Sequence, residues 1–315
     1  MLKIYIFAIM FFINSCGQLL PPNLKANIDQ NQRVKLTIGE ELVPKIDILF
    51  VIDNSGSMGS HQLNLKNQIE YYANEILKIS AINFRIAILG SDSLRGFDKP
   101  YLTRKTPNVL GVLKSSLLIG SRGGAIEKFF APVYEALNIA SNNNKVFLRQ
   151  DAALNLIFIT DTDDQSKISV TEFYNFLLSL KKEDSKIITF AALIKNSKCR
   201  GERSHDKITK LNNLISISGG TTVDLCSGYS LELIELAKKV VRQAFVFKLK
   251  EVPIYESIVL YYGNKIIPRS TDKGWSYNPK TVSIRISTYF FKNLPKNHAL
   301  EKLKLSYRRA RPSDL

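Results

Sequence analysis

The sequence "FVIDNSGSM", residues 50–58, places one acid and two hydroxyl groups directly after an apolar run. The acid is Asp53 and the hydroxyls belong to Ser55 and Ser57, and Gly56 permits a tight turn between the serines. Carboxylate and hydroxyl oxygens suit a hard cation, Mg²⁺ first and Ca²⁺ or Mn²⁺ as alternatives. Because serine ligands are neutral, a bound ion could still accept a carboxylate from a partner. The alternative is a turn that only connects a strand to a helix.

A second acid, Asp161, follows another apolar run at residues 154–160. Near-continuous apolar strands that alternate with helices predict a parallel sheet covered on both faces. In such a doubly wound α/β fold, ligands bind beyond the carboxyl ends of the strands, where the strand order reverses. We therefore expect Asp53 and Asp161 to meet at one edge of the sheet. The expected strands are residues 46–52, 83–89, 154–160, 186–194 and 221–225, and the expected helices are 60–79, 125–140, 170–182, 205–218 and 230–244.

The pattern changes after Ala244. Short strand-like runs follow, joined by turn residues such as Gly263-Asn264, without a long helical pattern. This predicts a small all-β domain over 246–315 behind the α/β domain at 45–245. Residues 33–43 are expected to form a short strand whose partner the sequence does not identify.

The first residues, "MLKIYIFAIMFFINSC", begin with one positive charge and an apolar run from Ile4 to Ile13. That run is too short to span a bilayer and suits the core of a signal peptide. The residues before Cys16 resemble the lipobox of bacterial lipoproteins. This resemblance implies a signal peptide over 1–15, lipidation of Cys16, and a tether over 16–44. With Gly17 after the cysteine it implies anchoring in the outer membrane; a plain secretory signal is the alternative.

The net charge is +16, from 44 Lys+Arg against 28 Asp+Glu. This surplus favours anionic partners such as envelope polymers or phospholipid headgroups. The basic residues are scattered, however, and no basic helix or aromatic-rich RNA motif organises them. Nucleic acid is therefore not an expected partner.

"FVIDNSGSM" resembles the metal-ion-dependent adhesion site (MIDAS) of von Willebrand factor type A (VWA) domains, and the similarity extends over about 46–245. The segment "FLRQDAALNLIFITDTDDQS", 147–166, resembles VWA lipoproteins of Gram-negative bacteria. The resemblance implies that Asp53, Ser55, Ser57 and Asp161 are metal ligands.

This chain departs from the VWA pattern at the middle motif. The family places a threonine after two glycines, whereas here Gly123-Gly124 is followed by Ala125. Ser121, or Glu127 from the following helix, is the candidate replacement ligand.

Three further residues lie beside these motifs. Asp163 and Asp164 are expected either to act on the metal indirectly, through bridging water, or to cap the loop. His61 is expected at the exposed start of a helix and not as a ligand.

Two cysteines remain after the lipobox, Cys199 and Cys226. In an exported chain they are expected to form one disulfide, in line with the late cysteine pair of the VWA lipoproteins. A zinc site with His205 is the alternative, but it lacks a fourth ligand.

The sequence thus predicts a lipid-anchored protein that binds an acidic side chain of a protein partner through its metal. Its oligomeric state is left open. One alternative is a structural envelope protein that holds anionic polymers by charge. The other is a metal-dependent hydrolase, but an enzyme is not expected. The sequence has only three histidines and no Ser-His-Asp order, and it contains no phosphate-binding loop motif.

Overall fold

The computed structural model describes residues 37–93, 97, 99–124, 126–138, 147–181, 186–193, 208–225, 228–294 and 301–311. Internal contacts divide the chain into Met1–Thr37 and Ile38–Leu315, and the elements described below belong to the second unit, apart from Thr37 itself. The predictions for Cys16, Ala125, Cys199, His205 and Cys226 lie outside the described residues.

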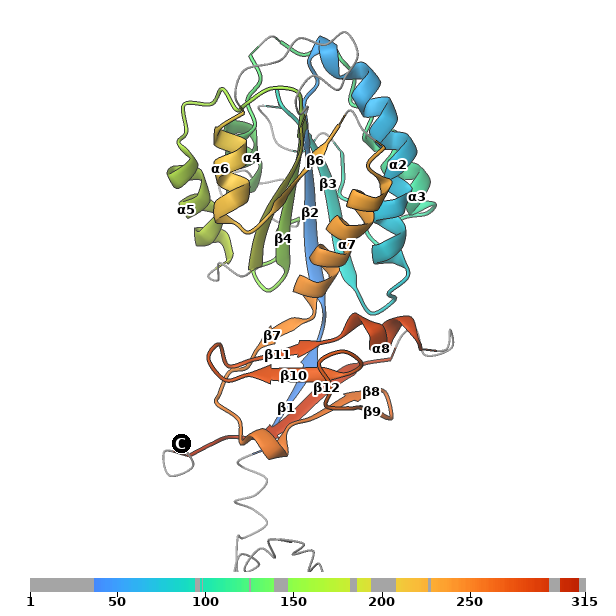
Figure 1. Ribbon diagram of the computed structural model, residues 1–315, viewed down its shortest axis with the longest axis vertical. Coiled ribbons are helices and arrows are strands. Elements are labelled where there is room, and N and C mark those ends of the chain that lie inside the picture. Colours follow the sequence, from blue (N-terminus) through green and yellow to red (C-terminus); the bar gives the residue numbers. More distant parts are fainter. Residues whose placement is uncertain are drawn as a thin grey trace, which may run out of the picture. The chain divides into compact units, whose positions relative to one another are not determined.

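Five parallel strands form the central sheet, in the order β3-β2-β4-β5-β6 (Figure 1). Every neighbouring pair is parallel, as predicted from the apolar runs. The strand order reverses between β2 and β4, because the chain first adds β3 on one side and later β4 on the other. The strands are β2 (Lys45–Ile52), β3 (Asn83–Gly90), β4 (Ala153–Thr160), β5 (Ile187–Leu193) and β6 (Thr221–Asp224).

Helices cover both faces of this sheet, which confirms the predicted doubly wound α/β class (Figure 1). Alternate residues of β2 point to opposite faces: Ile48 and Phe50 join one hydrophobic cluster, and Leu49 and Val51 join the other. The first cluster contains α2 (Gly59–Leu77), α3 (Val109–Ser116) and α7 (Ser230–Ala244), and the second contains α4 (Phe130–Leu137), α5 (Val170–Lys181) and α6 (Lys210–Ile217).

Two helices differ from the sequence prediction. α3 was not predicted, and it begins after Asn108, whose backbone is left-handed (φ 46°) and whose side chain accepts a hydrogen bond from the Gly111 amide. α4 begins at Phe130 and not at residue 125, which places Pro132 in its first turn. A proline is tolerated there because the first amides of a helix have no partner within the helix.

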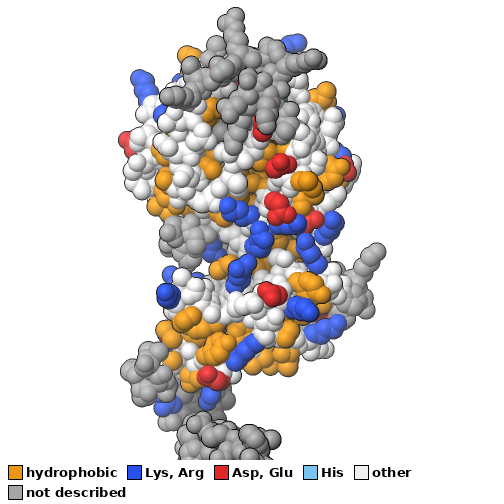
Figure 2. Space-filling model, viewed as in Figure 1, with side chains coloured by type: hydrophobic (Ala, Val, Ile, Leu, Met, Phe, Trp, Pro, Cys, Tyr) orange, Lys and Arg blue, Asp and Glu red, His pale blue; other side chains and the backbone are white. Residues whose placement is uncertain are grey.

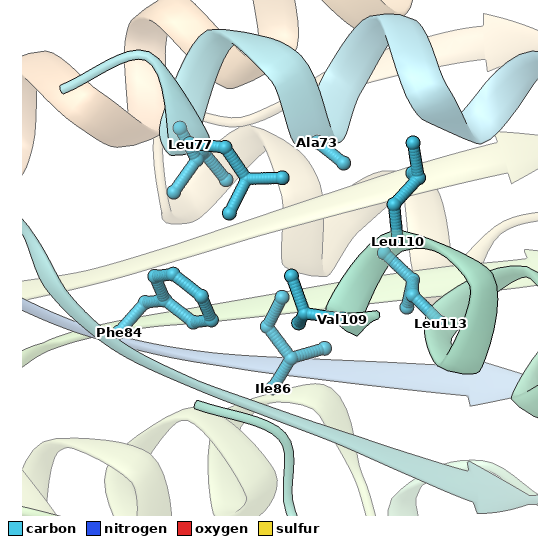
Figure 3. A pocket seen from close by; sticks show the side chains of 8 residues that line it. Ala73, Leu77, Phe84, Ile86, Val109, Leu110 and Leu113 are labelled. Atoms are coloured by element: carbon cyan, nitrogen blue, oxygen red, sulfur yellow. The ribbon is translucent and has the colours of Figure 1, made fainter. Parts of the chain in front are cut away.

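α2, β3 and α3 meet around a small apolar cavity. Figure 3 shows Ala73 and Leu77 of α2 facing Phe84 and Ile86 of β3, with side chains of α3 closing the space. Its volume is about 10 Å³, which is at the lower limit for a single water. This cavity is therefore a packing feature of the core and not a ligand site.

Two antiparallel sheets follow the α/β region, as predicted for residues 246–315. The three-stranded sheet has the order β10-β11-β7, and the four-stranded sheet has the order β1-β12-β8-β9. The strand expected near residues 33–43 is β1, and its partner β12 lies at the far end of the chain. The strands are β1 (Thr37–Leu42), β7 (Val246–Lys248), β8 (Val259–Tyr262), β9 (Lys265–Ile267), β10 (Trp275–Asn278), β11 (Ser283–Ile286) and β12 (Leu303–Arg308).

This region also holds a short helix, α8 (Thr288–Lys292), and a 3₁₀ turn, η4 (Tyr255–Ser257). Across the described residues, we find no helix that is both long and apolar enough to cross a membrane.

Candidate metal centre

Asp53 and Asp161 lie at the carboxyl ends of the two central strands. β2 and β4 are paired with Ile52 opposite Ile159, and the Asp53 amide continues this ladder by donating to the Ile159 carbonyl at 2.9 Å. Asp53 is fully buried and Asp161 is 4% exposed. The two acids therefore meet at the point where the strand order reverses, which is where α/β sheets bind ligands.

The D-x-S-x-S turn gathers its oxygen atoms on one side. The Ser55 amide donates to Asp53 Oδ1 at 2.8 Å, which closes the turn on itself. The Ser55 and Ser57 hydroxyls lie 3.2 Å apart. A 3₁₀ turn, η2 (Gly56–Met58), then leads directly into α2. Both hydroxyls and one carboxylate are thus held at the entrance to the same helix.

The loop that carries the predicted middle motif is fastened to this turn. Gln62 of α2 donates from Nε2 to the carbonyls of Asp53, at 2.9 Å, and Gly120, at 2.8 Å. The Gly123 amide donates to the Asn54 carbonyl at 2.8 Å. A Cβ at Gly123 would lie 2.3 Å from Asn54 Oδ1 and 2.8 Å from the Asn54 carbonyl oxygen, so only glycine permits this approach.

The two candidate substitutes for the missing threonine lie differently. Ser121 is exposed, and its hydroxyl lies beside Gly59 at the start of α2. Glu127 is partly buried; its carbonyl accepts from the Gln165 amide at 2.9 Å, and its carboxylate accepts from Gln165 Nε2 at 2.9 Å. Both residues border the site, but only Glu127 brings a third negative charge to it.

Three carboxylates consequently share this edge of the sheet. Burial raises the pKa of Glu127, and the charges of Asp53 and Asp161 raise it further. Burial also raises the pKa of Asp53; its hydrogen bonds to Ser55 and Thr160 oppose this, and the charge of Asp161 adds to it. No hydrogen bond from a described residue reaches the Asp161 carboxylate. Buried carboxylates that repel one another are the environment in which a bound cation gains most.

Acidic, histidine and cysteine side chains alone do not form a complete metal site in the described residues. In the described part of the chain, no group of three or more His, Cys, Asp or Glu side chains is arranged as a metal cluster. A cation at this edge would therefore depend on the Ser55 and Ser57 hydroxyls together with the acids. This mixed oxygen set fits Mg²⁺, Ca²⁺ or Mn²⁺.

Thr160 contacts the candidate site, and the sequence prediction did not include it. Its hydroxyl donates to Asp53 Oδ2 at 2.8 Å and accepts from the Thr162 amide at 3.0 Å. The Ser55 amide donates to the other oxygen, so hydrogen bonds to both oxygens fix the orientation of the Asp53 carboxylate. The sequence contained only a weak signal for this role, a hydroxyl residue directly before Asp161.

Asp163 and Asp164 cap helices. Asp163 accepts from the amides of Thr209, Lys210 and Leu211 at the start of α6, at 2.8–3.1 Å. Asp164 accepts from the amides of Phe129 and Phe130 at the start of α4, at 2.7 and 3.0 Å. The contacts of both aspartates are therefore those expected of a cap.

Lys210 adds a cation to this capping cluster, since its Nζ lies 3.1 Å from Asp164 Oδ2. His61 lies in the first turn of α2, in agreement with the sequence prediction, but the prediction of an exposed position is wrong, since the residue is only 6% exposed. The sequence pattern could not show this, because the burial of His61 depends on what covers the start of α2.

Replacing Asp163 with Ala is expected to lower the free energy of unfolding by about 1 kcal/mol, the usual value of an N-terminal cap. Cation affinity should stay within about twofold of the parent, because the carboxylate is directed at α6. Urea denaturation and cation titration on the same preparation test this. A tenfold loss of cation affinity would instead assign Asp163 to the metal centre.

No protein-family model and no curated protein sequence matches the chain. Solved structures similar to it include proximal thread matrix protein 1 from the mussel byssus, at 14% identity over 69% of this chain and 52% of that chain, TM-score 0.41. A second structure of that protein has a zinc-occupied MIDAS motif (TM-score 0.40). The pilus adhesin SpaC from Lactobacillus rhamnosus GG, in its open conformation, is 11% identical over 86% of this chain and 40% of that chain, with a TM-score of 0.40. The ArnB paralog VWA2 from Sulfolobus acidocaldarius is 11% identical over 86% of this chain and 59% of that chain, with a TM-score of 0.36.

The chain spans about half the length of the mussel protein. All of these TM-scores lie below 0.5. The fold class therefore rests on the strand order and helix placement of this chain itself: a five-stranded, doubly wound parallel sheet followed by antiparallel sheets.

Proposed function

We propose that this chain is a VWA-type binding protein that holds an acidic side chain of a protein partner through a divalent cation, with Mg²⁺ the first candidate. The observation that carries the proposal is the placement of Asp53 and Asp161 on paired strand ends, with two serine hydroxyls at the same edge of the sheet. Glu127 lies near enough for the charges of both acids to raise its pKa. When bound, the cation would supply a positive centre with room for one more carboxylate oxygen. Catalysis is not part of the proposal.

The protein residues would divide the work as follows. Ser55, Ser57, Asp53 and Asp161 would hold the ion, and Glu127 would take the place of the absent threonine. Thr160 and the Ser55 amide would orient Asp53, because they occupy one lone pair on each of its oxygens. A further feature supports partner binding: Ile126, which precedes Glu127 in the sequence, is 65% exposed and would offer a partner an apolar contact.

Lipid anchoring through Cys16 in the outer membrane and the Cys199–Cys226 disulfide remain part of this proposal, on the sequence features given above. Mass spectrometry of the protein from its native envelope tests both. The expected result is an acylated amino-terminal Cys16 and no alkylation of the other two cysteines before reduction. An unprocessed amino terminus would argue against the anchor, and two alkylated thiols would argue against the disulfide.

Cation affinity is expected to fall as the pH is lowered, because protons compete for the same carboxylates. Burial raises the pKa of both Asp53 and Glu127, so binding should be complete only above these raised values and should be lost as the pH falls through them. Titration from pH 7.5 down to pH 4, close to the ordinary pKa of the two carboxyls, measures this. Glu127→Gln should make the profile shallower; an affinity that is constant over this whole range would contradict the expectation.

Selection of peptides tests the binding function without a known partner. A random peptide library displayed on phage would be bound to the immobilised protein in Mg²⁺ and eluted with EDTA. We expect the eluted peptides to share an Asp or Glu, and their binding to be lost with Asp161→Asn. Peptides that bind equally in EDTA, or equally to the Asp161→Asn variant, would refute the proposed mode of recognition.

A further inference from the structure

A basic groove lies on the three-stranded sheet, on residues that the metal centre does not use. Its volume is about 670 Å³, within the range of small-molecule sites. The pairing register places two cross-strand rows on this face: Lys248, Ser283 and Asn278 form one row, and Val246, Arg285 and Ser276 form the next. The intervening residues, such as Ile284 and Phe247, pack toward the core.

The charge of this groove is one-sided. Four of its eleven lining residues are basic, Lys186, Lys248, Lys280 and Arg285, and none is acidic. At the average composition of the chain, eleven residues would include one or two basic and one acidic side chain. Within the described residues, no acid forms an ion pair with Lys248, Lys280 or Arg285. Figure 2 shows many Lys and Arg side chains, with a few Asp and Glu among them, across the region where α7 ends and the antiparallel strands begin.

The cations are spaced for more than one anionic group. Lys248 and Arg285 stand on adjacent strands in neighbouring rows, which places them roughly 7–8 Å apart as a diagonal pair. Lys280 enters from the turn between β10 and β11, and Lys186 enters from the start of β5, where its Nζ donates to the Val246 carbonyl at 3.1 Å. A single carboxylate is too small to contact all of these separated cations, whereas a ligand with two phosphate groups could contact them together.

The same groove offers hydroxyl groups on a fixed backbone. Thr281 and Ser283 hydroxyls lie 2.7 Å apart, and Ser276 lines the neighbouring row. Between them, Val282 holds a left-handed backbone (φ 49°), which is costly for a β-branched residue. The hydrogen bond from the Leu249 amide to the Val282 carbonyl, at 2.8 Å, keeps this turn in place. Strain of this kind is retained mainly where a loop must hold a specific shape.

We propose that this groove binds a phosphorylated polyol, with phosphates on Lys248, Lys280 and Arg285 and polyol hydroxyls on Ser276, Thr281 and Ser283. Lysine and arginine are the usual phosphate ligands of proteins, and serine and threonine hydroxyls both donate to and accept from sugar-like hydroxyls. Such a ligand exists free in solution or as the headgroup of a lipid. The proposal is independent of the cation site, because the two share no residue.

Isothermal titration with fructose 1,6-bisphosphate tests the free form, and vesicles of phosphatidylcholine with phosphatidylinositol 4-phosphate test the lipid form. We expect binding in at least one arm, and an affinity about tenfold or more weaker for Lys248→Gln/Arg285→Gln. The matched control is Lys265→Gln/Lys304→Gln, which removes the same charge from exposed positions on the other sheet and should change affinity less than about twofold.

Binding in neither arm would overturn the proposal. An equal loss in the control double variant would also overturn it, because attraction would then be a property of the whole basic surface. Inorganic phosphate that binds as tightly as the bisphosphate would exclude recognition of the polyol. Unfolding temperatures of both double variants, measured beforehand, ensure that a loss of binding is not a loss of structure.

Discussion

Replacing Asp53 with Asn is expected to stabilise the cation-free protein at neutral pH and to abolish its stabilisation by divalent cations. The Asp53 carboxylate is fully buried beside other acids, and burial raises its pKa. This cost is absent below the ordinary pKa of aspartate and is present in full once the pH exceeds the raised value. The gain from Asp53→Asn should thus be on the order of 1 kcal/mol at pH 7 and vanish near pH 4.

The asparagine can keep the local hydrogen bonds. Its carbonyl oxygen can accept from the Ser55 amide, and the Thr160 hydroxyl can turn to the Thr162 carbonyl, 3.2 Å away, while it accepts from the new amide. Parent protein in cation at about a hundred times its Kd should gain about 2.7 kcal/mol, and the variant none. Urea denaturation at pH 7 and pH 4, with and without Mg²⁺, measures both effects.

Asp272→Asn is the control, an exposed aspartate in the C-terminal region, and it should change neither property. A variant that loses stability at pH 7 without cation would show that the Asp53 charge is already compensated within the protein. The metal centre would then lose its electrostatic basis.

Replacing Asp47 with Ala is expected to destabilise the protein by about 3–5 kcal/mol, because it leaves buried cations without a counter-ion. Asp47 lies near the start of β2, at the opposite end of the strand from Asp53. Arg149 contacts it with Nε at 2.9 Å and Nη2 at 2.7 Å from Oδ1, and with its backbone amide at 2.7 Å from Oδ2. Lys181 Nζ lies 3.5 Å from Oδ2 and also donates to the Arg149 carbonyl.

The side chains of Asp47 and Lys181 are both fully buried. Burial lowers the pKa of Lys181 to about 8, against the opposing charge of Asp47. Adding Lys181→Met to Asp47→Ala should therefore restore part of the lost stability. Asp151→Ala removes an exposed carboxylate that pairs with Lys45, and should cost less than about 1 kcal/mol. Equal effects of Asp47→Ala and Asp151→Ala in urea denaturation would contradict this account.

The α/β part of the fold could be predicted from the sequence because its strands are buried on both faces. The run at 46–52, for example, is β2 with one residue added, and the acid that ends each central run marks the carboxyl edge. The start of α5 carries a capping box that is equally local: the Ser169 amide donates to the Glu172 carboxylate at 2.7 Å, and the Glu172 amide donates to the Ser169 hydroxyl at 3.2 Å. Such features are local in sequence, so the sequence contains the information needed to recognise them.

Features that depend on contacts distant in sequence could not be predicted. β1 pairs with β12 at the other end of the chain, and no local pattern identifies that partner. Gln62 donates hydrogen bonds to the carbonyls of Asp53 and Gly120 and so links the D-x-S-x-S turn to the next loop, yet in the sequence it is an ordinary polar residue of a helix. Likewise, Arg149 in the "FLRQDA" segment completes a buried ion cluster with Asp47, and only the fold brings these two residues together.

Isothermal titration of Mg²⁺, Ca²⁺ and Mn²⁺ into chelator-treated protein, beside Asp161→Asn and Glu127→Gln, tests the central claim most directly. We expect one cation per chain, no detectable binding with Asp161→Asn, and an affinity about tenfold weaker with Glu127→Gln. Those results would establish that acids from two strands and the intervening loop form one site. The absence of binding by the parent, or an unchanged affinity in both variants, would contradict the metal centre.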